Sequence, residues 1–269
     1  MLKKLKWVFK RHSLLYTTRF RLLSRNTDIN GISDEYYNKH NRKKDIPELF
    51  YTINAKILKD FKPKKEIDLA KKICLWLHQF IKSGPGLSEP SDEALKIMLD
   101  GRGGVCSDMS QIFNNFCVIN DIRVREWGVS RAPYERAYGG HSFNEIYSEN
   151  LNKWVAVDPY YCLFFLDNEE QYLSVVDLFQ AVRNDKNIKA DNFYRVTFLK
   201  EDGYKKNFFN ANNVPFLICN YSNKVYDKIL KRLKDYLPIF IIHFIIFLLG
   251  RSYYYKFPID NYKSIIRKV

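Results

Sequence analysis

The sequence lacks the features that mark disulfide-stabilised and zinc-binding proteins. Its 269 residues contain five cysteines, an odd number, with no CxxC pair and no regular spacing. Neither a disulfide framework nor a metal site is therefore expected, and reduced thiols in a cytoplasmic protein fit this pattern best. The apolar runs near the N-terminus are only three residues long, far short of the ~7–15 residues that a signal peptide needs. We do not expect export by the ordinary route.

Long apolar runs are also missing, with one partial exception near the C-terminus. Residues 237–249 are apolar apart from Pro238 and His243, and as a helix they would span about 20 Å of the ~30 Å hydrocarbon core. An aromatic belt follows at residues 253–255, and four basic residues precede the run: Lys228, Lys231, Arg232 and Lys234. We predict a tilted or partly inserted membrane anchor, and the alternative is a buried helix pair.

Acidic residues are scarce at the two ends of the chain. Lys and Arg number 44 against 30 Asp and Glu, which gives a net charge of +14. Residues 1–27 carry +8 and residues 224–269 carry +7, which leaves residues 28–223 at −1. Basic ends on a near-neutral body fit an anionic membrane surface, and no zinc, helix-turn-helix or ribonucleoprotein motif points to nucleic acid. We therefore expect the cytoplasmic face of a membrane as the location and no nucleic-acid partner.

The first 23 residues have the periodicity of a basic amphipathic helix. Apolar residues recur at steps of three and four, interrupted by His12, and most lysines and arginines lie off this stripe. Such a helix lies on an anionic membrane or packs against the domain, and both interpretations stay open. The polar stretch 26–47 predicts a loop. We predict three segments: a basic N-terminal segment, a central domain and a C-terminal segment that is a candidate membrane anchor, over residues 1–47, 48–223 and 224–269.

The central part contains helices followed by strands. Helical spacing predicts three helices, the first two ended by glycine-containing turns: 66–82, 91–100 and 107–120. Alternation then predicts three antiparallel strands, another helix and another strand: 122–129, 141–147, 153–157, 172–183 and 192–200. The 46% apolar content suffices for one sizeable core. The predicted fold class is α+β.

Cys106 stands out among the cysteines because it follows two glycines and directly precedes a helical pattern. At a helix N-terminus, the macrodipole and the free backbone N–H groups favour the thiolate. A nucleophilic thiolate also needs a base and a group that orients the base. His141 opens one predicted strand and Asp158 ends the next. Because the start of one antiparallel strand lies beside the end of its neighbour, the three residues can converge at one edge of the sheet.

Taken singly, each of these residues has an ordinary structural explanation. A cysteine after glycines is commonly structural, a single histidine is commonly a hydrogen-bonded polar residue, and Asp-Pro is commonly a turn. The other cysteines fit a catalytic role less well. Cys74 and Cys117 lie in helical apolar patterns, Cys219 lies in an apolar run, and no helix begins beside Cys162.

Three blocks of sequence, in order, resemble the transglutaminase-like superfamily: Gly103–Ser110, Gly140–Ile146 and Lys153–Pro159. The clear resemblance covers residues 66–160. It implies a papain-like α+β core with Cys106 as the nucleophile, His141 as general base and acid, and Asp158 orienting the imidazole. Phe143 departs from the family, whose members often carry Trp there. No calcium-site pattern of the animal enzymes is present, and no cofactor or metal is expected.

The resemblance implies acyl transfer through a thioester. The oxyanion would be held partly by the backbone N–H of Cys106; for the second donor, Gln79 and Trp76 are candidates from the chain upstream. Asp108 and Glu145 are candidate supports of the site, although an acid at a helix N-terminus also simply stabilises the helix dipole.

We predict an amidase or peptidase acting on a peptide or protein, in preference to a cross-linking enzyme, because no acceptor-site signature is visible. The alternative is a catalytically silent transglutaminase-like module for binding or assembly at a membrane. An intact Cys-His-Asp set is necessary for the enzyme but does not distinguish it from the silent module.

Overall fold

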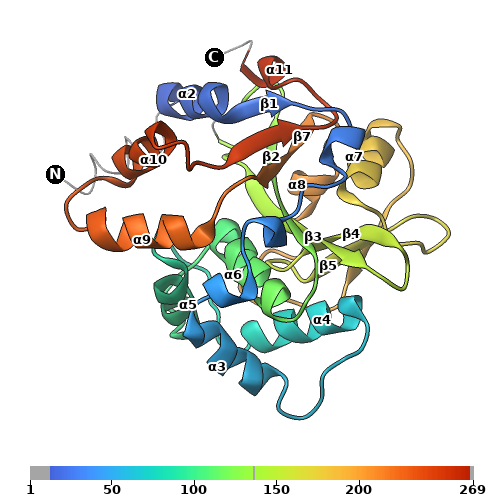
Figure 1. The fold of residues 1–269 in the computed structure, drawn as a ribbon. Coiled ribbons are helices and arrows are strands. Elements are labelled where there is room, and N and C mark those ends of the chain that lie inside the picture. Colours follow the sequence, from blue (N-terminus) through green and yellow to red (C-terminus); the bar gives the residue numbers. More distant parts are fainter. Residues whose placement is uncertain (1–12, 136, 267–269) are drawn as a thin grey trace.

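The predicted α+β class is confirmed by a computed structural model, which describes residues 13–135 and 137–266. In the described residues, one sheet has the strand order β1-β8-β7-β2-β3-β4-β5-β6, and all neighbours are antiparallel except β1 and β8 (Figure 1). The strands are β1 Ser24–Asn26, β2 Val124–Arg131, β3 His141–Ser148, β4 Lys153–Asp158, β5 Leu163–Leu166, β6 Lys189–Asn192, β7 Asn213–Cys219 and β8 Tyr254–Phe257.

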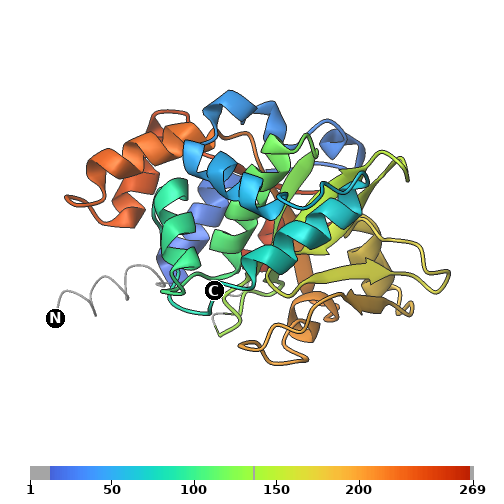
Figure 2. The same ribbon diagram turned by 90° about the horizontal axis from the view of Figure 1, so that it is seen from below.

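Helices cover both faces of this sheet. The longer helices gather on one face around α6, which packs on β2 and β3, while α7 packs on β4 and β7 on the other face (Figures 1 and 2). Two separate apolar cores result, because the alternating side chains of each strand point to opposite faces. The helices are α2 Ser13–Leu23, α3 Glu48–Ile57, α4 Glu66–Leu77, α5 Ser91–Leu99, α6 Cys106–Ile119, α7 Val175–Arg183, α8 Lys205–Phe208, α9 Asn223–Leu233, α10 Ile239–Leu248 and α11 Tyr262–Ile266.

The elements with strong local signals lie where they were predicted. α5 and α6 match their predicted ranges within one residue at each end, and β2, β3 and β4 coincide with the three predicted strands apart from small shifts at their ends. The first predicted helix, however, ends at Leu77 instead of residue 82. The chain turns there, and the His78 side chain is buried against the Pro159 carbonyl oxygen, which lies 2.8 Å from its Nε2 atom.

The strand predicted over 192–200 is wrong for most of its length. β6 begins earlier, at Lys189, and its last pair is Asn192 opposite Leu163, the first residue of β5. Since β5 is only four residues long, the residues after Asn192 have no strand to pair with. Their aromatic side chains instead pack over His78, with the ring centres of Tyr194 and Phe198 both 6.0 Å from the imidazole.

Both ends of the described chain contribute to the sheet. β1 follows α2, and its parallel partner β8 lies close to the other end of the sequence. Phe20 of α2 is buried against Phe216 and Tyr255, with ring centres 5.4 and 5.1 Å away. Residues 1–12, which form half of the predicted amphipathic stripe, lie outside the described residues. Among the described helices, none combines the length and apolar character needed to cross a bilayer.

The polar stretch 26–47 is mainly irregular, as predicted, but contains three short 3-10 helices: Asn30–Ile32, Tyr37–Lys39 and Lys43–Asp45. Its polar groups bind the sheet. Arg125 of β2 donates hydrogen bonds to the carbonyls of Ile32, Ser33 and Glu35 at 2.7 to 2.8 Å. This segment is therefore fastened to the central sheet through a buried guanidinium.

Candidate active site

Cys106 is the first residue of α6, and the backbone before it is shaped by two glycines. Gly103 and Gly104 have φ angles of +145° and +117°, which residues other than glycine rarely adopt. A Cβ atom on Gly104 would also lie 2.7 Å from the Met98 side chain. The chain can therefore turn sharply into α6 and place Cys106 in the first helical turn, whose N–H groups have no acceptor within the helix itself.

Asp108 secures this turn. One of its carboxylate oxygens, Oδ2, accepts hydrogen bonds from the backbone N–H groups of Val105 (3.0 Å) and Leu87 (3.2 Å). The first contact caps the N-terminus of α6 and the second holds the preceding loop against it. Asp108 is thus a structural support of the helix that carries Cys106, and its negative charge also suits a helix N-terminus.

We expect Asp108→Ala to lower the free energy of unfolding by about 1 kcal/mol, the usual value of a lost helix cap, and to slow alkylation of Cys106 several-fold. Asp177→Ala is the matched control, because Asp177 occupies the same position in the capping box of α7. Urea unfolding and the rate of iodoacetamide labelling measure the two effects. Equal slowing by both variants would contradict a local role of Asp108.

His141 and Asp158 lie side by side on neighbouring strands. β3 and β4 pair with Asn144 opposite Val157, and Nε2 of His141 lies 2.7 Å from Oδ2 of Asp158. The other oxygen, Oδ1, accepts hydrogen bonds from the backbone N–H groups of Tyr160 (2.9 Å) and Tyr161 (3.1 Å). Asp158 is fully buried. Its carboxylate is therefore fixed in the orientation that holds the imidazole.

The thiol of Cys106 meets the same imidazole. It is hydrogen-bonded to the His141 side chain, and the backbone N–H of Ser142 donates to the same sulfur. Because Nε2 of His141 is engaged with Asp158, the nitrogen that faces the sulfur is Nδ1. Cysteine, histidine and aspartate thus form one continuous chain of hydrogen bonds.

The electrostatics of this chain favour a thiolate and an imidazolium. Burial by itself raises the pKa of Cys106, but the charge of His141 and the hydrogen bonds from His141 and Ser142 outweigh it, so that the pKa of the thiol is lowered. Burial by itself lowers the pKa of His141, but Asp158 and Cys106 outweigh it and raise that pKa. The opposite shifts match a nucleophile and its proton donor at neutral pH.

Aromatic rings enclose the imidazole. The ring of Phe143 lies parallel to it at 6.2 Å between centres, and Phe208 and Tyr161 lie at 5.7 and 5.6 Å. These aromatic side chains limit the access of water to the His141 imidazolium and strengthen its electrostatic attraction to Cys106 and Asp158. Cys106 itself is half-buried, whereas the other four cysteines are buried, and all five are free.

Other residues of this region were not anticipated from the sequence. Tyr160, next to the Asp158–Pro159 turn, is hydrogen-bonded to Ser83, so that the loop after α4 lies beside the site. His78 contacts the Pro159 carbonyl, and burial lowers its pKa, which favours a neutral ring that donates through Nε2. The only signals in the sequence were a histidine near a helix end and a Tyr-Tyr pair after Asp-Pro.

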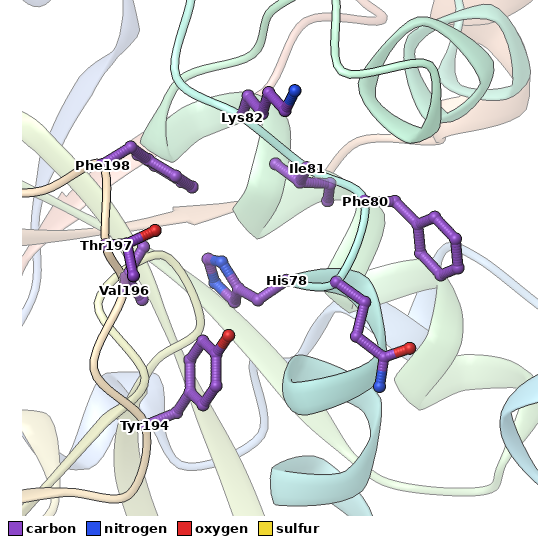
Figure 3. A pocket seen from close by; sticks show the side chains of 9 residues that line it. His78, Phe80, Ile81, Lys82, Tyr194, Val196, Thr197 and Phe198 are labelled. Carbon is purple, nitrogen blue, oxygen red and sulfur yellow. The ribbon is translucent and has the colours of Figure 1, made fainter.

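A pocket of about 270 Å³ adjoins this loop (Figure 3). The segment that follows α4 forms one side and the irregular segment after β6 forms the other. Its lining residues are His78, Gln79, Phe80, Ile81, Lys82, Tyr194, Val196, Thr197 and Phe198.

The structure does not bring all candidate residues to one place. Trp76 packs on Phe80, with ring centres 4.7 Å apart, and Gln79 lines the pocket. In the described part of the chain, neither forms a hydrogen bond with Cys106, His141 or Asp158.

Glu145 forms its hydrogen bonds with a different set of residues. It accepts hydrogen bonds from Arg125, Trp127 and the backbone N–H of Val175 at the start of α7. These contacts connect the sheet to α7 and indicate a structural role for this carboxylate.

Comparison with known proteins identifies the central part of the chain. A model of the transglutaminase-like superfamily matches residues 53–159, a stretch that runs from α3 to the turn after β4 and includes Cys106, His141 and Asp158. No curated protein and no solved structure matches the chain. Within residues 13–135 and 137–266, no group of three or more His, Cys, Asp or Glu side chains could hold a metal ion.

Proposed function

Because residues 53–159 form a transglutaminase-like domain, we propose that the protein is a thiol acyl-transfer enzyme that acts on an amide of a peptide or protein. The observation that supports this proposal is the hydrogen-bonded chain from Cys106 through His141 to Asp158, which begins at the N-terminus of α6. A silent binding module would have no need of a thiol whose pKa is lowered by a buried imidazolium.

In the first half of the proposed reaction, the Cys106 thiolate attacks the amide carbonyl carbon and forms a C–S bond. The carbonyl oxygen becomes an oxyanion, which the backbone N–H of Cys106 can stabilise. His141 then gives its Nδ1 proton to the amide nitrogen, the C–N bond breaks, and the amine leaves. An acyl thioester on Cys106 remains, while Asp158 keeps the imidazole in position throughout.

In the second half, we propose water as the acyl acceptor. His141 takes a proton from water, the oxygen attacks the thioester carbonyl, and the C–S bond breaks to give a carboxylic acid and the free thiolate. A cross-linking reaction would need to admit a cationic lysine side chain. Lys82 lines the neighbouring pocket, and its positive charge disfavours that acceptor.

A mass-spectrometric assay with a pool of peptides tests this function. We expect hydrolysis at peptide bonds or deamidation of side-chain amides, and less incorporation of an added fluorescent primary amine. Cys106→Ala should abolish every product, whereas Cys219→Ala, a cysteine buried in β7, should leave them unchanged. Hydroxylamine would release an acyl hydroxamate from the wild-type thioester. If the wild type forms none of these products and no hydroxamate, the catalytically silent binding module is favoured.

A further inference from the structure

Several large apolar side chains in and next to α10 are exposed. All its residues are apolar except His243, yet only Ile242 and Ile246 are buried. Phe244, Leu248 and Leu249 are 51%, 66% and 61% exposed. Phe244 and Leu248 are four residues apart and share one face of the helix. A helix that is apolar all round normally lies in a protein core or in lipid, and no residue within 13–135 and 137–266 covers this face of α10.

Basic residues lie on the helix next to α10 and directly after α10. α10 packs against α9, and the two helices lie at one extremity of the molecule in both ribbon views (Figures 1 and 2). Lys228 and Arg232 on α9 and Arg251 after α10 are exposed, and none of them forms an ion pair with a described residue. By contrast, Lys231 is paired with Asp92 at 2.7 Å. The positive charge beside α10 is thus available to an external anionic partner.

We propose that α10 docks the protein on an anionic lipid surface. Phe244, Leu248 and Leu249 would enter the interface between headgroups and acyl chains, while the neighbouring basic residues meet the headgroups. Ten helical residues extend about 15 Å, half the thickness of the hydrocarbon core. The helix therefore lies along the membrane and does not span it.

Charge also argues against a second copy of the chain as the covering partner. A two-fold symmetric contact through α10 would place the same surface of both copies face to face. Lys228, Arg232 and Arg251 of one copy would then approach the same residues of the other, and like charges across an interface oppose binding.

Sedimentation of the full chain with vesicles tests the proposal. Vesicles of phosphatidylcholine mixed with phosphatidylserine should bind the protein, and pure phosphatidylcholine should bind it weakly. Leu248→Asp should lower the partition coefficient for the anionic vesicles at least about tenfold, because it removes an apolar side chain that the lipid would bury and adds a negative charge. Leu151→Asp is the matched control, since Leu151 is also exposed, at 42%, but lies in the β3–β4 turn. It should bind like the wild type.

Raising the salt concentration should weaken binding of the wild type, because salt screens the contacts to the headgroups. Residues 1–12 also carry basic side chains, but they are unchanged in Leu248→Asp, so a loss of binding assigns the contact to α10. The labelling rate of Cys106 should be the same in both variants, which separates this result from the proposed enzymatic function.

Three results would overturn the proposal. They are equal binding by Leu248→Asp and the wild type, equal binding to neutral and anionic vesicles, and a dimer in analytical ultracentrifugation that Leu248→Asp dissociates. The last result would identify α10 as an interface between two copies.

Discussion

Iodoacetamide is expected to label Cys106 well before the other four cysteines at about pH 6.5, where an ordinary thiol with a pKa near 8.5 is only about 1% thiolate. Alkylation requires the thiolate, and the pKa of Cys106 is lowered by His141 and Ser142. Burial raises the pKa of Cys74, Cys117, Cys162 and Cys219. Selectivity for Cys106 therefore has two independent causes, its charge state and its accessibility.

The direction of the pH dependence follows from the signs of the two shifts. Labelling of Cys106 rises as the pH passes upward through its lowered pKa and then stays level, because the thiolate persists at higher pH. Acyl transfer also needs the proton on His141, so its rate should fall again as the pH rises through the raised pKa of that imidazole. The labelling rate plotted against pH should thus show a single rise, and the rate of acyl transfer should show a bell-shaped curve.

His141→Ala should slow labelling of Cys106 at about pH 6.5 at least tenfold. Loss of the imidazolium leaves a half-buried thiol with an ordinary pKa near 8.5, which alone would slow labelling by about 100-fold, and the greater nucleophilicity of a more basic thiolate offsets part of this. His40→Ala is the matched control, because His40 is a half-buried histidine next to the short helix Tyr37–Lys39. Peptide mapping by mass spectrometry gives the rate for each cysteine. Equal rates for all cysteines in the wild type would remove the basis of the enzymatic proposal.

Helix α6 and the strands β3 and β4 could be predicted because their signals are local. Two glycines before Cys106 and an apolar stripe after it define the start of α6 without any knowledge of distant residues. His141 and Asp158 belong to strands joined by a short turn, which allows few antiparallel registers. The convergence of these two side chains follows from connectivity and not from long-range packing.

The outer strands could not be predicted because they depend on distant partners. β1 and β8 are three and four residues long, too short for an alternation of apolar and polar residues to be visible. They pair with each other although they lie near opposite ends of the described chain. Similarly, nothing near His78 indicates that its partner is the Pro159 carbonyl, on a turn that α4 meets only in the folded protein.

The role of Glu145 depends on contacts that a sequence does not display. From the sequence, Glu145 is a candidate support of the site. In the folded chain, its carboxylate lies 3.0 Å from Arg125 and 3.1 Å from the indole nitrogen of Trp127, and both charged side chains are almost completely buried. Arg125 also holds three carbonyls of the N-terminal segment. Glu145 therefore joins α7, the sheet and that segment at one point.

Glu145→Ala is expected to lower the free energy of unfolding by about 3–5 kcal/mol, the usual cost of removing one partner from a buried ion pair. The loss is large because the guanidinium of Arg125 and the N–H groups of Trp127 and Val175 are left without their acceptor. It is a substantial fraction of the ~5–15 kcal/mol that stabilises a typical domain. Urea unfolding should show a lower midpoint with little change in slope.

Glu149→Ala is the control for this prediction, since Glu149 pairs with Arg123 and its side chain is 67% exposed. An exposed pair of this kind contributes at most about 1 kcal/mol. In the folded fraction of Glu145→Ala, the labelling rate of Cys106 should equal that of the wild type, because the carboxylate acts on the fold and not on the thiolate. Slower labelling of Cys106 in fully folded Glu145→Ala would instead mean that this carboxylate affects the thiolate through His141, which lies on the same strand, β3. Unfolding and labelling of the same variant therefore separate a structural support from a residue that tunes the candidate active site.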